Sequence, residues 1–526
     1  MRNLYSILVI FCLIAFSISC RKDFSTIEST GNLTFSRDTI FLDTIFTNIS
    51  SSTYALKVYN KSNKDIHIPS INLGRGDNSF YRLNVDGIPG KSFENTPLLA
   101  KDSLYVLIEA TIDFDLLSDP IYKDSIVFHS GEKLQDVKLI TTVKDAHFIY
   151  SDLTTAQLKK IRDTITDPVR KLAHFTSFET TDIYGDTVAK RVLTNSELHF
   201  TNAKSYSLYN YCIVPENKTL VIDAGAQLFF HDKAALIIEK NATIQINGTL
   251  DNKVTIEGNR LEFDFSETAG QWDGIWLKPE SKENTIAHTR IKNAAVGIIC
   301  DSISTSSAEP TLTIKNSEIY NTSVVGLLAS ESYIKAENLV IGNSRQGSLS
   351  ITNGGSYEFN HCTFANYWSD GVRRFETVQI SNNEFDLDEE DNPVYRAKDL
   401  TKANFTNCII TGNNSREIEF FKNETAVFSV LFENCLLKYN SSNEDPLYDF
   451  TDETLYPGIL LNGEPNFRDT SSNDFIMGEE SEAINKGKVE NALRTPLDIL
   501  GIDRTLAPDI GAYQHIIFET EEEIEE

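Results

Sequence analysis

An all-β fold, with a right-handed parallel β-helix preceded by an immunoglobulin-like β-sandwich, is what the sequence predicts. One short phrase repeats through the second half of the chain, and evenly spaced strands fill the region before it. The composition, with 31 Phe and 20 Tyr against 2 Met, favours strands over helices. A chain of 526 residues has room for two or three such domains.

The first residues have the pattern of a removable secretory signal. An Arg, an apolar run from Leu4 to Phe16 and small residues precede Cys20. The run is too short to span a membrane. We therefore expect residues 1–19 to be a lipoprotein signal peptide, Cys20 to carry lipid and residues 20–32 to form a tether.

The motif "SISC" resembles the lipobox of bacterial lipoproteins, with Ser17 where Leu is usual. "RKDFS" after the Cys is similar to surface-export signals of Bacteroidetes lipoproteins. The resemblance implies an exported outer-membrane lipoprotein held by its N-terminal lipid. It favours the cell surface, with the periplasmic face as the alternative.

Residues 33–147 alternate between apolar and polar residues, in segments about ten residues apart. Seven such strands with turn residues between them predict an immunoglobulin-like β-sandwich. The segments are TIFLDTIF, YALKVYN, IHIPSINL, FYRLNVDG, SLYVLIEATI, DSIVFHS and VKLITTV. "KVYNKSNKDIHIPSINLG" resembles the Hydin-like immunoglobulin domains of Bacteroidetes surface proteins, which implies a spacer or adhesive module.

Residues 148–211 are expected to form a linker and the N-terminal cap of the solenoid. Within them, "TTAQLKKIRDTITDPVRKL" has the spacing of a helix. The cap is needed because an open coil end exposes strand edges.

The repeated phrase is an Asn or His, two residues, a large apolar residue and usually a second Asn. Its copies, 21 to 28 residues apart, begin at His288, Asn316, Asn338, His361, Asn382, Asn407 and Asn434. A repeat this short must stack on its neighbours to bury its apolar face, which predicts a parallel β-helix over residues 212–515. We expect the Asn side chains to stack at the corners, with His substituting as a hydrogen-bonding group.

Three cysteines, Cys362, Cys408 and Cys435, share one slot of the phrase and are expected to point into the core as a column. A Cys408–Cys435 bridge is an open alternative, since adjacent coils lie close enough and an oxidising compartment permits it.

"GGSYEFNHCTFANYW", with the run beginning at "NKVTIEGN", resembles a family of Bacteroidetes lipoproteins known by their β-helix repeats. "SEAINKG" and "PDIGAYQH" are similar to the closing coil of bacterial surface β-helices, which implies a C-terminal cap. Residues 516–526 are expected to be a solvated acidic tail. The resemblance implies fold and location but no reaction.

The net charge of −28 opposes long-range attraction to nucleic acid, so nucleic acid is not an expected partner. Of the substrate-binding and catalytic phrases of the polygalacturonase family, only Arg290-Ile291-Lys292 is present. With Ile291 facing the core, its two neighbours are expected to be outward charges on a strand.

A polysaccharide lyase would need calcium or Arg to neutralise a uronate, and a base to remove a proton. An acidic insertion containing Asp386, Asp388 and Asp391 is the candidate calcium site, and Arg373 and Arg374 lie one coil earlier. A solvated loop is the competing interpretation. No other cofactor is expected.

Aromatic residues give the clearest trace of binding, because a sugar ring stacks its C–H face on an exposed aromatic side chain. All three Trp lie in the solenoid, and inward-facing Ile275 and Leu277 would turn Trp276 outward. The candidate glycan-binding residues are Trp272, Trp276, Tyr367, Trp368, Arg373 and Arg374.

The combined expectation is a lipid-anchored scaffold that binds glycan, or adheres to a surface protein, without catalysis. Two alternatives stay open. One is a lyase or glycoside hydrolase acting on an extracellular polysaccharide, and the other is a purely structural surface element.

Overall fold

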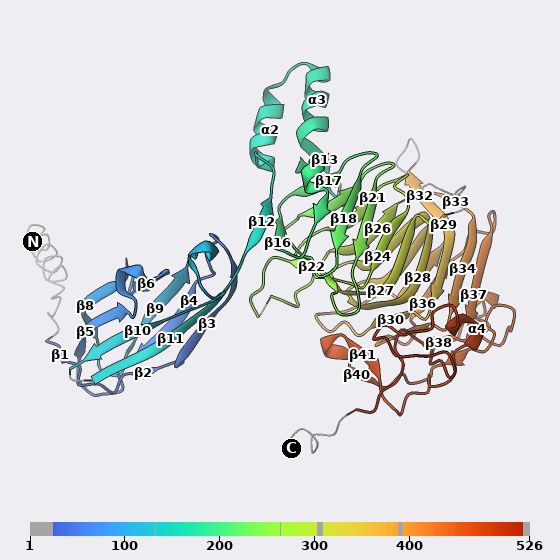
Figure 1. Ribbon diagram of the computed structural model, residues 1–526. Coiled ribbons are helices and arrows are strands. Elements are labelled where there is room, and N and C mark those ends of the chain that lie inside the picture. Colours follow the sequence, from blue (N-terminus) through green and yellow to red (C-terminus); the bar gives the residue numbers. More distant parts are fainter. Residues whose placement is uncertain (1–24, 132, 264, 302–308, 388–392, 519–526) are drawn as a thin grey trace, which may run out of the picture. The chain divides into compact units, whose positions relative to one another are not determined.

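The computed structural model describes residues 25–131, 133–263, 265–301, 309–387 and 393–518 (Figure 1). The chain divides into two compact units between Asp145 and Ala146, two residues before the boundary expected from the sequence. Within the described residues, no helix combines the length and the apolar character needed to cross a membrane.

The first unit is a sandwich of two β-sheets. One sheet contains β1 (Ile27–Glu28), β5 (Ile66–Leu73), β10 (Ile121–Ser130), β11 (Lys133–Lys144) and β3 (Thr39–Phe46), with β8 (Ser92–Leu98) on β5. The other contains β2 (Thr34–Phe35), β4 (Tyr54–Tyr59), β9 (Ser103–Ala110), β6 (Tyr81–Val85) and β7 (Ile88–Gly90). Short 3-10 turns are η1 (Gly76–Asn78) and η2 (Phe114–Leu116).

Inward-facing and outward-facing residues alternate along the strands of this sandwich, and the inward-facing ones form its core. Along β9, Leu104, Val106 and Ile108 are buried, whereas Tyr105 and Leu107 face outward. All seven strands expected from the sequence are present, and β8 is the longest strand that the pattern did not predict.

The second unit begins with β12 (Ala146–Ile149) and a pair of helices, α2 (Thr155–Thr164) and α3 (Pro168–Phe178). Thr154 and Gln157 form a capping box at the start of α2, and Asp167 followed by Pro168 starts α3. The expected helical segment is therefore confirmed as two helices. A hairpin of β13 (Glu179–Thr181) and β14 (Thr187–Val192) follows, with η3 (Asn195–Glu197) after it.

The rest of the unit is a parallel β-helix with three faces. The first face stacks β14, β17 (Tyr211–Val214), β20 (Ala235–Ile238), β23 (Gly274–Leu277), β26 (Val296–Asp301), the starts of β28 (Val325–Ser344) and β29 (Gly347–Asn360), β31 (Val378–Ser381) and β36 (Ile418–Phe421).

The second face stacks β15 (His199–Phe200), β18 (Thr219–Asp223), β21 (Thr243–Asn247), β24 (Asn284–Ala287), the start of β27 (Leu312–Thr322), later parts of β28 and β29, β34 (Leu400–Thr406) and β37 (Phe428–Glu433). The third face stacks β12, β16 (Ser205–Leu208), β19 (Gln227–Phe230), β22 (Val254–Gly258), β25 (Thr289–Lys292), the ends of β27 and β28, β30 (Thr363–Asn366), β35 (Ile409–Gly412), β38 (Leu436–Leu437) and β39 (Leu460–Leu461).

The corner between the second and third faces explains the repeated phrase. Asn316, Asn338, His361 and Asn407 all have φ between 49° and 53°, a left-handed conformation that Asn tolerates better than most residues. Their side chains also bond from coil to coil: Asn338 Nδ2 donates to Asn316 Oδ1 (2.7 Å), and Asn407 Nδ2 donates to His361 Nε2 (2.8 Å). We call this stack of hydrogen-bonded corner side chains the corner ladder. The prediction that Asn side chains stack there, with His able to replace Asn, is confirmed.

The interior is a continuous column of aliphatic and aromatic side chains. Phe405 stacks on Phe359 (4.9 Å between ring centroids) and on Phe432 (4.7 Å) in neighbouring coils. The column of cysteines is confirmed as well, and all five cysteines in the described residues are buried, free thiols. Burial raises the pKa of the Cys408 thiol well above its ordinary value, so this thiol stays protonated and inert.

Two parts of the solenoid differ from the expected one. The copy of the phrase at Asn382 makes no coil, because β32 (Asn383–Leu387) and β33 (Pro393–Ala397) pair with each other as an antiparallel hairpin between β31 and β34. The last coil is covered by residues 445–459, which include η4 (Pro446–Tyr448), and Tyr456 stacks on Phe432.

The C-terminal segment, expected to close the end of the helix, instead lies along the third face. It contains β40 (Phe467–Asp469), η5 (Thr470–Ser472), β41 (Asp474–Met477) and α4 (Val489–Ala492). Phe475 and Tyr513 pack with Tyr320, and the Gly511 amide donates to Asn407 O (2.8 Å). Figure 1 shows β40 and β41 beside the third-face strands β27, β30 and β38.

Candidate functional site

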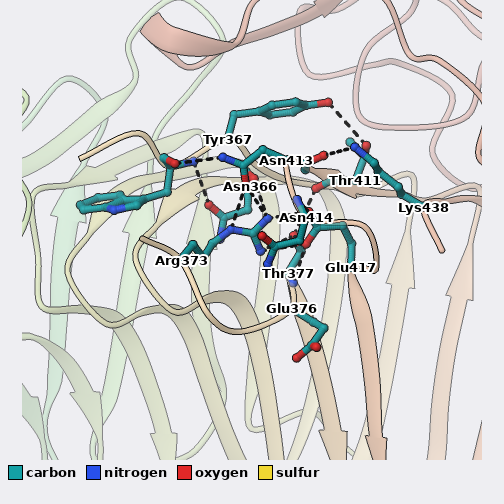
Figure 2. Close-up of polar contacts among 12 residues, drawn as sticks. Asn366, Tyr367, Arg373, Glu376, Thr377, Thr411, Asn413, Asn414, Glu417 and Lys438 are labelled. Atoms are coloured by element: carbon teal, nitrogen blue, oxygen red, sulfur yellow. Dashed lines mark hydrogen bonds and ion pairs between the residues drawn. The ribbon is translucent and has the colours of Figure 1, made fainter. Parts of the chain in front are cut away.

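The loop between β30 and β31 and the loop after β35 meet at a corner that we call the sealed corner, residues 366–377 and 411–417. Arg373 and Glu417 form its centre, with side chains 1% and 0% exposed. The guanidinium makes two parallel bonds to the carboxylate: Nη1 to Oε2 (2.8 Å) and Nη2 to Oε1 (2.5 Å) (Figure 2). Such a bidentate pair fixes geometry as well as charge.

Every remaining bonding position of this pair is used. Arg373 also donates to the carbonyls of Phe375 and Asn366 and to Asn413 Oδ1. Glu417 accepts from the Thr377 hydroxyl (2.7 Å) and from the Asn414 amide (2.7 Å). The assignment of Arg373 as a glycan ligand is therefore wrong: its charge is buried and saturated, and it holds two loops together.

Beside this corner, the third face carries a hollow of about 450 Å³ that we call the lateral cavity. Its wall comes from β25, β27 and β28, from the loop after β30, and from η5 in the C-terminal segment. The lining residues are Glu267, Arg290, Lys292, Tyr320, Asn321, Asn343, Trp368, Ser369, Asp370, Ser471, Ser472 and Asn473.

Trp368 is the aromatic wall of the lateral cavity. The sealed corner fixes its backbone, because Asn413 Nδ2 donates to Trp368 O (3.0 Å) and Trp368 N donates to Asn366 Oδ1 (3.3 Å). The side chain is 9% exposed, and its indole Nε1 has no hydrogen-bond partner within the described part of the chain. This N–H is itself enclosed by the protein, so it is not an accessible donor at the wall of the cavity.

Amide side chains line the floor of the cavity. Asn321 and Asn343 occupy left-handed corner positions (φ 52° and 48°), and they are the second Asn of the repeated phrase. Asn473 of the C-terminal segment bonds to both: its Nδ2 donates to Asn321 Oδ1 (3.1 Å) and its Oδ1 accepts from Asn343 Nδ2 (2.9 Å). The cavity is therefore preorganised by contacts between segments far apart in the sequence.

Charged groups on one side of the cavity are paired rather than free. Arg290 Nε lies 3.0 Å from Glu318 Oε2, and Lys292 Nζ lies 2.8 Å from Glu267 Oε1. Burial alone would raise the pKa of Glu318, but the Arg290 and Lys253 charges hold it below its ordinary value. Burial would likewise lower the pKa of Arg290, but Glu318 raises it above its usual range, so both groups are charged.

The other candidate residues do not gather at this cavity. Trp272 is 1% exposed, stacks on Phe230 (4.3 Å) inside the solenoid and donates its Nε1 to Lys292 O (2.9 Å). Its assignment as a glycan ligand is wrong, because its ring is packed in the core of the solenoid. Tyr367 is half-buried and packs on Phe475. Arg374 is exposed and lies outside the lining of the cavity.

Trp276 points outward from β23, as alternation with the buried Ile275 and Leu277 predicted. The Lys278 ammonium lies 3.3 Å from the centroid of its ring, which is a cation–π contact. A sugar ring would have to displace this lysine in order to stack on Trp276.

The predicted calcium site is not described. Asp388 and Asp391 lie outside the described residues, as does the side chain of Asp386, whose backbone belongs to β32. In the parts of the chain that are described, no three His, Cys, Asp or Glu side chains are grouped so as to hold a metal ion. The calcium hypothesis stays a prediction.

A larger hollow of about 700 Å³ lies at the base of the β32–β33 hairpin, lined in part by Glu331, Tyr333 and Lys398. It contains no Trp, and Lys398 and Glu331 are paired across it at 3.3 Å. Sequence reasoning did not single out either hollow. The second Asn of the phrase was a usable signal for the lateral cavity, but Asn473 and Glu267 come from segments with no repeat.

Comparison with known proteins supports the solenoid. A family model described as a right-handed beta helix region matches residues 296–463. A search of curated proteins finds no match. The second unit is thus a right-handed parallel β-helix in an all-β chain.

Two solved structures resemble parts of the chain. One is a protein of unknown function from Porphyromonas gingivalis W83, with 14% identity over 22% of this chain and 49% of that one, and a TM-score of 0.17. The other is a family 123 glycoside hydrolase from Clostridium perfringens, with 10% identity over 26% and 30%, and a TM-score of 0.15. The matches span half or less of those proteins.

Proposed function

We propose that this chain is a lipid-anchored, exported scaffold whose β-helix binds glycan without catalysis, and that the lateral cavity is the binding site. The observation that carries the proposal is the lining of the lateral cavity, in which the aromatic residue Trp368 adjoins amide, hydroxyl and charged groups. Sugar recognition needs this combination of an aromatic face and convergent polar groups.

The volume and rigidity of the hollow support a short glycan segment as the ligand. A volume of about 450 Å³ lies within the usual range for small-molecule sites. The sealed corner and the Asn473 contacts hold the walls in place before binding, so little conformational entropy is lost.

Two carboxylates at the cavity are held by neighbouring cations, which favours binding over proton transfer. A hydrolase needs one carboxyl group as an acid and a second as a base or nucleophile. Glu318 is held ionised beneath the cavity by Arg290 and Lys253, and Glu267 is engaged by Lys292 and by Asn321 Nδ2 (2.7 Å). Arg373, the cation that a lyase would have used on a uronate, is committed to Glu417.

The lipid at Cys20, the outer-membrane location at the cell surface and the Bacteroidetes type of lipoprotein belong to the same proposal. Their support is the "SISC" and "RKDFS" sequence alone. A Cys20→Ser variant should lose the mass of the acyl chains and leave the membrane fraction. If the variant stays membrane-bound with an unchanged mass, lipidation is overturned.

Affinity electrophoresis tests the binding site. The protein from Arg21 to Glu526 is run through gels cast with different neutral and acidic polysaccharides, beside its Trp368→Ala and Trp276→Ala variants. We expect retardation in one gel for the protein and for Trp276→Ala, and free migration of Trp368→Ala. A cleared zone in the stained gel would indicate cleavage and favour the enzyme alternative. Unchanged mobility in every gel would contradict glycan binding for the polysaccharides tested.

A further inference from the structure

The paired helices α2 and α3, here called the helical hairpin, make few contacts with the solenoid that carries them. Figure 1 shows them side by side, projecting beyond the strands at the N-terminal end of the β-helix. Along α2 only Leu158 is buried, and no residue of α3 is. Arg162, in the last turn of α2, donates from Nη1 to the buried carboxylate of Glu179, which directly follows α3 (3.1 Å).

Large apolar side chains gather at the free end of the hairpin. Val169 is 77% exposed and Leu172 is 63% exposed in the first turns of α3, and Ile161 is exposed near the end of α2. Spaced three residues apart, Val169 and Leu172 share one face of their helix. Isolated exposed aliphatics are ordinary, but a group of them at the tip of a projecting element marks a contact surface.

The same two helices carry four exposed bases: Lys159, Lys160, Arg170 and Lys171. None of the four has an ion-pair partner in the part of the chain that the structure describes. The acids of the hairpin are Asp163 and Asp167, and the Asp167 carboxylate caps α3 by accepting from Arg170 N (2.8 Å). The hairpin is thus basic in a chain whose net charge is −28.

We propose that the helical hairpin docks on an anionic lipid surface, with Val169 and Leu172 entering the headgroup region and the four bases contacting lipid phosphates. Charge complementarity selects this partner. Helices that bind at a membrane interface combine Lys and Arg with exposed apolar side chains. Lys is depleted in protein–protein interfaces, so three lysines here favour lipid over a protein partner.

The acidic remainder of the chain does not prevent this contact. At physiological ionic strength, charges more than about 8 Å apart in solvent are largely screened, so the local charge of the tip governs its approach to a surface. The inference is independent of the lateral cavity, because a hairpin that fails to bind lipid would leave the glycan site unaffected.

Hydrogen exchange of the full chain in lipid vesicles tests the docking. The chain is reconstituted into phosphatidylcholine vesicles with or without phosphatidylglycerol, and exchange of the amides of residues 155–178 is followed by mass spectrometry. We expect these amides to exchange about tenfold or more slowly when phosphatidylglycerol is present, since each base near an anionic surface adds to the bound population. Strands of the first unit serve as the internal reference.

Two variants separate the contribution of the bases to lipid binding from that of the apolar side chains. A Lys159→Gln, Lys160→Gln, Arg170→Gln, Lys171→Gln variant should lose the effect of phosphatidylglycerol, and Val169→Ser with Leu172→Ser should lose most of the protection. Unchanged exchange in the solenoid strands shows that either variant is folded. Equal exchange in both lipids would overturn the proposal. Protection that appears without lipid would overturn it too, in favour of self-association, as would protection that needs an added protein.

Discussion

Among the arginine–glutamate pairs that bridge neighbouring coils of the β-helix, Arg373–Glu417 and Arg290–Glu318 differ in their surroundings. Arg373 and Glu417 lie inside the sealed corner with side chains at most 1% exposed, whereas the Arg290 side chain is 46% exposed above Glu318 at the lateral cavity. Glu417 has no second cation within the described residues, but Glu318 also pairs with Lys253 (3.3 Å). The same residue types therefore serve a structural role at one site and border the lateral cavity at the other.

The largest predicted effect is on the free energy of unfolding, and it differs between variants of these two pairs. Arg373→Met should lower the free energy of unfolding by about 3–5 kcal/mol, because it leaves the Glu417 carboxylate buried without its partner. Arg290→Met should lower it by about 1 kcal/mol or less, since Arg290 is half exposed and Lys253 still neutralises Glu318. Denaturant unfolding of both variants measures the difference, and equal losses would contradict the distinction.

The corner ladder predicts the next effect. Asn407→Ala should lower the free energy of unfolding by about 2–3 kcal/mol. Ala is strained in the left-handed backbone conformation, and it lacks the hydrogen bonds to His361 and to Lys488. Asn407→Gly is the matched control: it keeps the backbone conformation and should recover about half of that loss. A glycine variant as unstable as the alanine variant would show that backbone strain contributes nothing.

A smaller predicted effect is a loss of folding stability in acid, which we assign to His361. Burial, and then the charge of Arg504, hold the pKa of His361 well below its ordinary value, so it is neutral in the fold and accepts from Asn407. The unfolded chain binds a proton below about pH 6.5 and the fold does not. Stability should therefore fall by about 1.4 kcal/mol per pH unit as the pH drops from about 6.5 towards the depressed pKa.

The His361→Asn variant checks this assignment, because Asn occupies the same corner in neighbouring coils. Unfolding of the variant should lack that part of the slope between about pH 6.5 and pH 5, with the rest of the acid response unchanged. An identical slope in both proteins would assign the sensitivity to another group.

The repeat predicted much of this architecture, because a corner that needs a left-handed residue selects Asn and a strand facing the core selects aliphatics. The same logic predicted the direction of Trp276 and the cysteine column. It failed at Asn382, where the local phrase is present but the chain leaves the solenoid as a hairpin. A phrase of a few residues does not determine which other strand its own strand pairs with.

The candidate site was harder to predict, because its contacts join segments far apart in the sequence. Arg373 is 44 residues from Glu417, and Asn473 is 152 residues from Asn321. Nothing near Arg373 indicates that its charge is already paired. For Trp272, composition suggested a binding aromatic, and only the position of its coil shows that the ring stacks inside the core.

The central claim is that Trp368, and not the outward-facing Trp276, contacts the glycan. The most direct measurement is calorimetric titration of both alanine variants with an oligosaccharide of the polysaccharide that retards the protein. Trp368→Ala should bind about tenfold more weakly or worse, as expected for loss of a central aromatic contact, and Trp276→Ala should bind within about twofold of the unaltered protein. Full affinity in Trp368→Ala, or a loss confined to Trp276→Ala, would contradict the claim.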